Sequence, residues 1–333
     1  MKIKFAVIFL AACVFLSACA IPMQTEKGFY LNSFGDSFSA GNTLFCVTED
    51  ALCAYSQSGQ ALWEEAKNMA DARWNVSGSF AVIYDCGGNG IITTDGKTAK
   101  HNYINNIIMS IEINKHGYTA VCTEEAGYKG SVTVYDAAFT PLYKWYCASG
   151  YVINAALSGE NTLAVLTANA EGSTVHVFSL KSEEEQYSLT VPNTLAIDLC
   201  FMDEALCLIS ETALYFADED KITDMVSFEG TLGEYALTEE YAFTEQRNGD
   251  GTSMLYTYDG SGKCIGSAEC EMLRSVVAES GYIAVISGGE AIVFDKTLRE
   301  KLRCDAAGVR SIMLCGGNLM LQRDSEIIVK KFN

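Results

Sequence analysis

A pattern of two short strands joined by a turn recurs along this chain at intervals of roughly 40 residues. In each copy an apolar strand such as 291–294 is followed by a turn rich in Asp, Ser, Gly and Lys, and then by a second strand. The copies lie at Ala51–Glu64, Gly90–Tyr103, Ser131–Trp145, Thr174–Leu189, Ala213–Phe228, Met254–Ala268 and Ala291–Arg303, with a truncated copy at Ile327–Asn333. Repeats of this length with several short strands are typical of β-propeller blades. The sequence therefore predicts an all-β fold, a β-propeller.

Aligning the copies predicts the number of blades. The first strands of the units are expected to begin near Asp36, Asp71, Ile107, Val152, Leu195, Leu232, Leu273 and Val309. The last unit ends after three strands. Because an open sheet edge leaves backbone groups unpaired, we expect Gly28–Phe34 to supply the fourth. This predicts a single domain over 28–333 with eight four-stranded blades closed by an N-terminal strand, or seven blades if two weak units merge.

The first residues have a different character. Lys2 and Lys4 precede an apolar run over 5–18, the layout of a secretory signal. The run ends in Leu16-Ser17-Ala18-Cys19, which resembles a bacterial lipobox. The resemblance implies a signal peptide over 1–19, cleavage before Cys19 and lipidation of its sulfur, followed by a short tether over 20–27. The alternative is an uncleaved membrane anchor, although a span typically needs about 20 residues. Either way, we expect the propeller outside the cytoplasm, anchored to the bacterial cytoplasmic membrane.

Charge and cysteine content restrict the partners and the covalent chemistry. A net charge of −19 argues against nucleic acid as a partner. Setting aside Cys13 and Cys19 leaves an odd number of cysteines, several of them inside apolar strands and none in a C-x-x-C pair. We expect mostly free, buried thiols. Cys264 and Cys270 would be the pair to bond if any does.

One unit carries a family resemblance. Its residues Cys53-Ala54-Tyr55-Ser56, Gly59 and Trp63 resemble the repeat of quinoprotein-like propellers of the pyrroloquinoline-quinone type, with Ser56 in place of the usual Asp. Together with the lipobox, the chain also looks like envelope propellers of Gram-positive bacteria, which implies a fold and no activity. A quinone dehydrogenase of this superfamily would need a vicinal disulfide, and the chain has no Cys-Cys dipeptide. We therefore expect no cofactor.

The candidate site is the mouth of the central channel, where propellers bind their ligands. The aligned channel-side positions are Gly35, Asp71, Ser110, Asn154, Ile197, Leu232, Arg274 and Arg310. The last two belong to a repeated Arg-Ser dipeptide, and guanidinium groups that face one cavity repel unless an anion or a carboxylate lies between them. Either an anion binds there, or nearby acids neutralise the arginines: Glu271, Asp305 and Asp36. Arg73 and Trp74, beside Asp71, would add a stacking face for a sugar or a peptide.

The sequence predicts a binding protein rather than an enzyme. The three histidines and the glycine-rich turns form no recognisable metal, nucleophile or phosphate motif. We expect a membrane-tethered, non-enzymatic module that binds an envelope protein, peptide or glycan. One alternative is a hydrolase or lyase that uses the channel carboxylates Asp71, Asp198 and Glu234. Another is a scaffold of an envelope assembly complex, which would expose an apolar patch on one rim.

Overall fold

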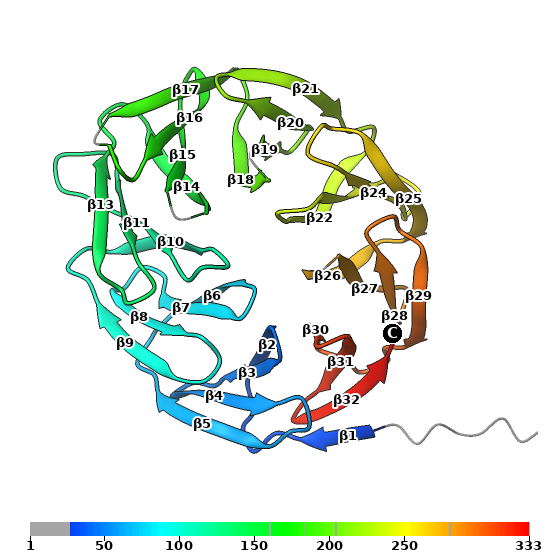
Figure 1. Cartoon of the computed structure of the whole chain (residues 1–333). Helices are drawn as coiled ribbons and strands as arrows, with labels where there is room; N and C mark the ends of the chain where they lie inside the picture. Colours follow the sequence, from blue (N-terminus) through cyan, green and yellow to red (C-terminus); the bar gives the residue numbers. More distant parts are fainter. Residues whose placement is uncertain (1–26, 160, 183, 204, 280, 333) are drawn as a thin grey trace, which may run out of the picture.

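The computed structural model describes residues 27–159, 161–182, 184–203, 205–279 and 281–332. In this part of the chain, 32 strands form eight four-stranded sheets, which stand as blades around a central axis (Figure 1). The prediction of an eight-bladed all-β propeller is therefore confirmed, and the alternative of seven blades is wrong. The predicted lipobox with Cys19 and the tether as far as residue 26 lie outside the described residues.

In blades 1 to 7 the strands follow one another outward in chain order, from the axis to the rim, and blade 8 takes its outermost strand from the N-terminus (Figure 1). The strands of blades 1 to 4 are β2 (Asp36–Ala40), β3 (Thr43–Val47), β4 (Ala51–Ser56), β5 (Ala61–Ala66), β6 (Ala72–Ser77), β7 (Phe80–Asp85), β8 (Gly90–Thr94), β9 (Ala99–Tyr103), β10 (Ile108–Ile113), β11 (Thr119–Thr123), β12 (Ser131–Tyr135), β13 (Pro141–Tyr146), β14 (Tyr151–Ser158), β15 (Thr162–Asn169), β16 (Gly172–Ser179) and β17 (Glu185–Pro192).

The strands of blades 5 to 8 are β18 (Ala196–Met202), β19 (Ala205–Ser210), β20 (Ala213–Asp218), β21 (Lys221–Ser227), β22 (Thr231–Leu237), β23 (Ala242–Arg247), β24 (Thr252–Tyr258), β25 (Cys264–Glu271), β26 (Leu273–Glu279), β27 (Tyr282–Ser287), β28 (Glu290–Asp295), β29 (Glu300–Asp305), β30 (Ser311–Cys315), β31 (Asn318–Arg323), β32 (Glu326–Lys331) and β1 (Lys27–Tyr30). The eight predicted starts of the inner strands agree with the structure to within two residues.

The N-terminal strand closes the ring as predicted. β1 pairs antiparallel with β32, with Lys27 opposite Val329 and Tyr30 opposite Glu326, so it becomes the fourth strand of blade 8. In Figure 1 the blue β1 accordingly lies beside the red β32. The ring of Phe29 packs onto Gly59, where an added Cβ would lie 2.3 Å from the ring. Gly59 also has a φ of +83°, which L side chains rarely adopt, so a glycine is required there.

The core lies between adjacent blades. Small residues on the second strands, such as Ala120 and Ala284, are fully buried and allow neighbouring sheets to approach closely. Trp63, the tryptophan of the quinoprotein-like unit, donates a hydrogen bond from Nε1 to the carbonyl of Gly96 in blade 2, at 3.2 Å. This side chain therefore joins two blades.

The cysteines of the described residues are free thiols. Six of them are buried, which confirms the expectation from their apolar surroundings. Cys264 and Cys270 lie near opposite ends of β25, roughly 20 Å apart along the strand at its usual rise, far beyond the reach of a disulfide. No helix in the described part of the chain is long and apolar enough to span a membrane.

Candidate functional site

β-Bulges near the start of the inner strands decide which side chains face the channel. The strand register shifts between Ile108 and Ser110, and shifts at the same place in the inner strands of blades 4 to 7. A bulge sets two residues against one and changes the side to which the following residues point. In blade 5 it brings Asp198, one residue after the predicted Ile197, to the channel. In blade 7 the extra residue is Arg274, and Ser275 lines the channel.

The central channel contains a cavity of about 940 Å³ that is lined by residues of all eight blades. Asn154 of blade 4, one of the predicted residues, hydrogen-bonds to the two carboxylates that line this cavity, Glu112 and Asp198. Its amide nitrogen donates to Asp198 Oδ1 of blade 5 at 2.8 Å and to Glu112 Oε1 of blade 3 at 3.2 Å. Its oxygen accepts a hydrogen bond from Ser110 at 3.3 Å. One amide thus connects three adjacent blades.

Two further side chains extend this network. Asn75 of blade 2 donates to Glu112 Oε2 at 2.6 Å. The hydroxyl of Tyr235 in blade 6 donates to Asp198 Oδ2 at 3.4 Å. Hydrogen bonds between side chains therefore run through five consecutive blades, from blade 2 to blade 6, and both carboxylates are held by neutral partners.

The network favours one proton on its carboxylates at neutral pH. Burial, and then the nearby charge of Asp198, raise the pKa of Glu112 to about 8, although hydrogen bonds from Asn154 and Asn75 favour the charged form. Burial also raises the pKa of Asp198. Asp198 is among the carboxylates predicted from the sequence, whereas Glu112 is not. Glu112 lies two residues after the predicted channel residue Ser110 and therefore on the same face of β10, and this spacing is the sequence signal for Glu112 as a channel residue.

The two arginines predicted to share a cavity have separate partners. Arg274 is exposed and donates from Nη2 to the backbone carbonyl of Val309 at 2.5 Å. Arg310 lines the channel, with its guanidinium 4.7 Å from the centre of the Phe34 ring and 3.9 Å from Asp324. The acid that lies near Arg310 is therefore Asp324, which was not among the neutralising acids expected from the sequence. Asp305, which was expected, lies 3.5 Å from Arg323 instead.

The remaining predicted residues lie near blade 2. Asp71 and Arg73 form an exposed ion pair with each other, at 3.0 Å. Trp74 lines the channel, and its ring stacks on Phe38 with 5.2 Å between the ring centres. Of the three carboxylates proposed for catalysis, Asp198 lines the channel cavity, whereas Asp71 pairs with Arg73 and Glu234 lies 4.0 Å from Arg247. The structure brings Asp198 together with Glu112 instead.

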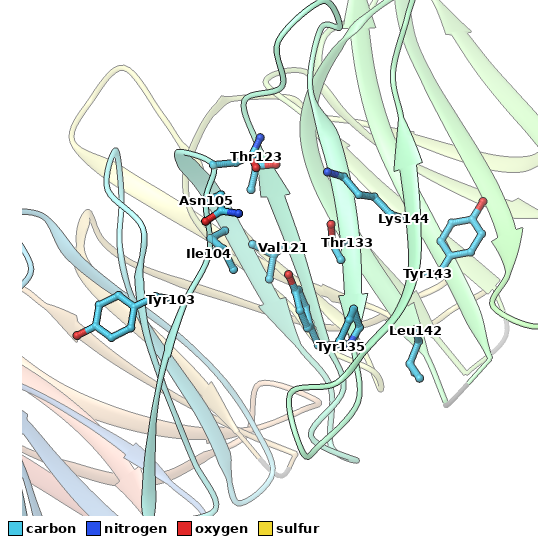
Figure 2. A pocket seen from close by; sticks show the side chains of 12 residues that line it. Tyr103, Ile104, Asn105, Val121, Thr123, Thr133, Tyr135, Leu142, Tyr143 and Lys144 are labelled. Atoms are coloured by element: carbon cyan, nitrogen blue, oxygen red, sulfur yellow. The ribbon is translucent and has the colours of Figure 1, made fainter.

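A second cavity, of about 520 Å³, lies on blade 3 beneath the connection from blade 2. Figure 2 shows Ile104 and Asn105 of this connection beside Val121 of β11, with Thr133 and Tyr135 of β12 nearby. The cavity was not predicted from the sequence.

The fourth strand of blade 2 explains this cavity. In blades 1, 3 and 4 the fourth strand carries an aromatic residue at one aligned position. These residues are Trp63, Tyr143 and Tyr187, and each packs toward the next blade. The matching residue in blade 2 is the exposed Lys100, which pairs with Thr93. Because the fourth strand of blade 2 carries Lys100 instead of a large ring at this position, a space remains in front of blade 3.

Exposed tyrosines lie next to this cavity. Within the described residues, six of the twelve exposed large hydrophobic side chains fall between Tyr103 and Tyr151. We call Tyr128, Tyr146 and Tyr151 the tyrosine surface. The rings of Tyr128 and Tyr146 are 4.9 Å apart, and Lys144, which also lines the cavity, lies 4.7 Å over the Tyr146 ring. The cavity is therefore continuous with Tyr146 and Tyr128, and Tyr151 lies beside Lys129, whose Nζ is 4.7 Å from the centre of its ring.

Comparison with known proteins places the chain in a family. A family model described as a family of unknown function, DUF5711, matches residues 32–327. The chain belongs to this family. No curated protein matches this DUF5711 chain.

Solved structures resemble the DUF5711 chain in fold. BamB from Moraxella catarrhalis is 14% identical, with a TM-score of 0.59 over 92% of this chain and 98% of BamB. The computationally designed Ika8 protein is 13% identical, with a TM-score of 0.66 over 91% and 98% of the two chains. AztD from Citrobacter koseri is 11% identical, with a TM-score of 0.56 over 82% and 86%. These neighbours are β-propellers, and at such identities the likeness shows the fold alone.

Proposed function

We propose that this protein is a non-enzymatic binding module of the cell envelope, held outside the cytoplasm by a lipid on Cys19. Its partner is a protein, peptide or glycan of the envelope. The observation that carries this proposal is the tyrosine surface beside the blade 3 cavity. The fold is of a kind that suits an interaction module.

Tyrosine is well suited to such a surface. Its ring offers a large apolar face and its hydroxyl a hydrogen bond, and few rotatable bonds have to be ordered when a ligand binds. Tyr151 is 60% exposed and Tyr128 is 48% exposed, so their rings remain accessible in the folded protein. The blades hold the side chains in place before any ligand arrives, which lowers the entropy cost of binding.

Co-sedimentation with envelopes tests the binding function. The full chain in mild detergent would be mixed with envelopes from which detergent has removed the lipids, so that a lipid anchor contributes nothing. We expect the wild-type chain to sediment with them, and the double variant Tyr128→Ala/Tyr146→Ala to bind roughly tenfold more weakly. Tyr30→Ala, which removes a 70% exposed tyrosine from blade 8, is the matched control and should bind like wild type. Equal binding by the double variant would contradict the proposal.

Metabolic labelling tests the anchor separately. Radioactive palmitate should label the protein in a bacterial cell, and Cys19→Ser should abolish the label and leave the signal peptide uncleaved. A wild-type chain that keeps its first residues and takes up no label would instead support the uncleaved anchor.

A second candidate function rests on the channel. Glu112, with a pKa of about 8, and Asp198 lie in one cavity, an arrangement that resembles the acid and base of a hydrolase or lyase. Turnover of a panel of glycans and peptides by the wild-type chain, lost in Glu112→Gln, would support this function. Both carboxylates are already bound by amide and hydroxyl groups, which favours a structural role.

A further inference from the structure

We infer that the cavity on blade 3 is a binding site for a neutral oligosaccharide. The inference rests on the proposed binding function and names its ligand. A sugar ring has apolar C–H faces and a rim of hydroxyl groups, so its site needs an apolar or aromatic wall together with several uncharged hydrogen-bonding groups. The blade 3 cavity offers both, and its volume of about 520 Å³ lies within the usual range for small-ligand sites.

The apolar wall is rigid. Tyr135 lines the cavity and stacks on Phe139, with ring centres 4.2 Å apart and planes within 7° of each other. Leu142, 46% exposed, and Pro141 border the same space. Because the stack fixes Tyr135, this wall would lose little conformational freedom when a sugar binds.

The uncharged polar groups of the cavity are amides and hydroxyls. Asn105 is exposed at the rim, and no hydrogen bond of its side chain is present among the described residues. Its neighbour Asn106 donates to the carbonyl of Glu124 at 2.9 Å and to Glu125 Oε2 at 3.2 Å. These two bonds hold the 103–106 connection in position and present Asn105 to the cavity. Thr133 adds a hydroxyl group to the lining, whereas the hydroxyl of Thr123 is hydrogen-bonded to Ser131 Oγ at 2.9 Å.

The charge of the site favours a neutral ligand. Lys144 is the cation of the lining, and its Nζ lies 2.8 Å from Glu125 Oε2. The hydrogen bond from Lys144 lowers the pKa of Glu125, so this carboxylate stays ionised and neutralises the ammonium group. With no uncompensated cation in the cavity and a net charge of −19 on the chain, an anionic polymer would be repelled.

The tyrosine surface extends the site. Lys144 contacts both the cavity and the Tyr146 ring, and Tyr128 lies beyond Tyr146. A chain of several sugars that starts in the cavity would therefore continue over exposed aromatic rings, which stack on the apolar faces of successive units. This geometry favours an oligosaccharide over a single sugar.

Calorimetric titration of the full chain in detergent tests the inference. The probes are neutral hexasaccharides of glucose, mannose, galactose and N-acetylglucosamine, with an oligogalacturonate of the same length as the anionic comparison. We expect binding of at least one neutral probe and none of the anionic one. Thr133→Phe, which fills the cavity, should weaken binding roughly tenfold or more, and Asn105→Ala several-fold. Thr133→Ser, which keeps the hydroxyl, and Tyr30→Ala should bind like wild type.

Binding of no neutral probe, or unchanged binding by Thr133→Phe with a wild-type melting temperature, would overturn the inference. If the Thr133→Phe chain melts at a lower temperature than wild type, the exposed Asn105→Ala variant takes its place, and an unchanged affinity of that variant would overturn the inference equally.

Envelopes treated with protease or with periodate separate this inference from the binding function. If protease removes the binding to envelopes and periodate does not, the partner is a protein, so the oligosaccharide is wrong and the binding function stands. If untreated envelopes do not bind at all, the binding function fails as well.

Discussion

The side-chain amide of Asn154 donates a hydrogen bond of 2.8 Å to Asp198, which lies one blade further round the ring. The same amide donates to Glu112 in the preceding blade, at 3.2 Å. A single neutral group thus holds two acidic side chains in the channel, and the arrangement is most stable when one of the acids carries a proton.

Glu112→Gln should make the protein less sensitive to alkaline pH. The pKa of Glu112 rises from 4.5 to about 8 on folding, so the folded chain keeps a proton that the unfolded chain releases between these values. The free energy of unfolding therefore falls as pH rises through this window, by up to about 1.4 kcal/mol per pH unit. Glutamine, like the protonated acid, is neutral, has both a donor group and an acceptor oxygen, and does not titrate.

Urea unfolding at half-unit steps from pH 5 to pH 9 measures this effect. The wild-type chain should lose stability steadily up to about pH 8, and Glu112→Gln should show a flatter profile and a higher stability at pH 9. Asp71→Asn, a change in an exposed ion pair, is the control and should follow the wild-type profile. Parallel profiles for wild type and Glu112→Gln would show that Glu112 is ionised in the fold.

Glu245→Ala should destabilise the ring strongly. The Glu245 side chain is fully buried, and it accepts hydrogen bonds from Arg247, from Ser253 Oγ at 2.7 Å and from the backbone amide of Leu273 in blade 7 at 2.8 Å. Its removal leaves these donors without a partner, at a cost of about 3 kcal/mol or more. Glu269→Ala, in the outermost strand β25 of the same blade and exposed, should change stability by less than about 0.5 kcal/mol.

Glu245 should also make the stability of the fold sensitive to acid. Burial alone would raise the pKa of Glu245, but hydrogen bonds from Arg247 and from backbone amides outweigh it and lower the pKa. The stabilisation is therefore complete above the ordinary glutamate pKa of about 4.3 and is lost as pH falls below it. Thermal melts from pH 3 to pH 6 should show a smaller acid-induced decrease in melting temperature for Glu245→Ala than for wild type. An equal decrease would assign the acid sensitivity to other groups.

The repeat pattern predicted the ring but not the details of its channel. Blade number and strand starts follow from local alternation and turn residues, which the aligned copies display directly. The channel positions also depend on β-bulges, and a bulge is a pairing between strands that one strand does not reveal. Asp198 instead of Ile197, and Ser275 instead of Arg274, face the channel for this reason. The blade 3 cavity follows from Lys100, whose significance appears only when it is set beside Trp63 and Tyr143 in three dimensions.

Among the cysteines of the described residues, Cys264 should react fastest with a thiol reagent. It is the exposed one, whereas burial raises the pKa of Cys122 to about 12 and that of Cys46 to about 11. Burial limits access to these thiols and their raised pKa lowers the fraction of thiolate, so both slow a reaction that requires the thiolate. Titration of the native chain with a chromogenic disulfide should show one rapid thiol, which Cys264→Ser removes. Several rapid thiols in the native chain would indicate that the blades open readily.

Phe29→Ala should loosen the closure of the ring. Phe29 packs on Gly59 from strand β1, and this contact attaches β1 to blade 1 while its backbone pairs with β32 in blade 8. Its truncation should cost about 1–3 kcal/mol, because the ring is only partly buried. Its neighbour Tyr30 is 70% exposed, so Tyr30→Ala should cost less than about 0.5 kcal/mol and serves as the matched control.

Loss of this contact should also promote association of the chains. When β1 detaches, the edge of β32 presents unpaired backbone groups that can pair with a second chain. Size-exclusion chromatography in detergent should therefore reveal dimers or larger species for Phe29→Ala at concentrations where wild type and Tyr30→Ala elute as a single smaller species. If Phe29→Ala loses stability in urea without associating, β1 remains paired with β32 through its backbone hydrogen bonds alone, and the aromatic contact contributes packing rather than closure.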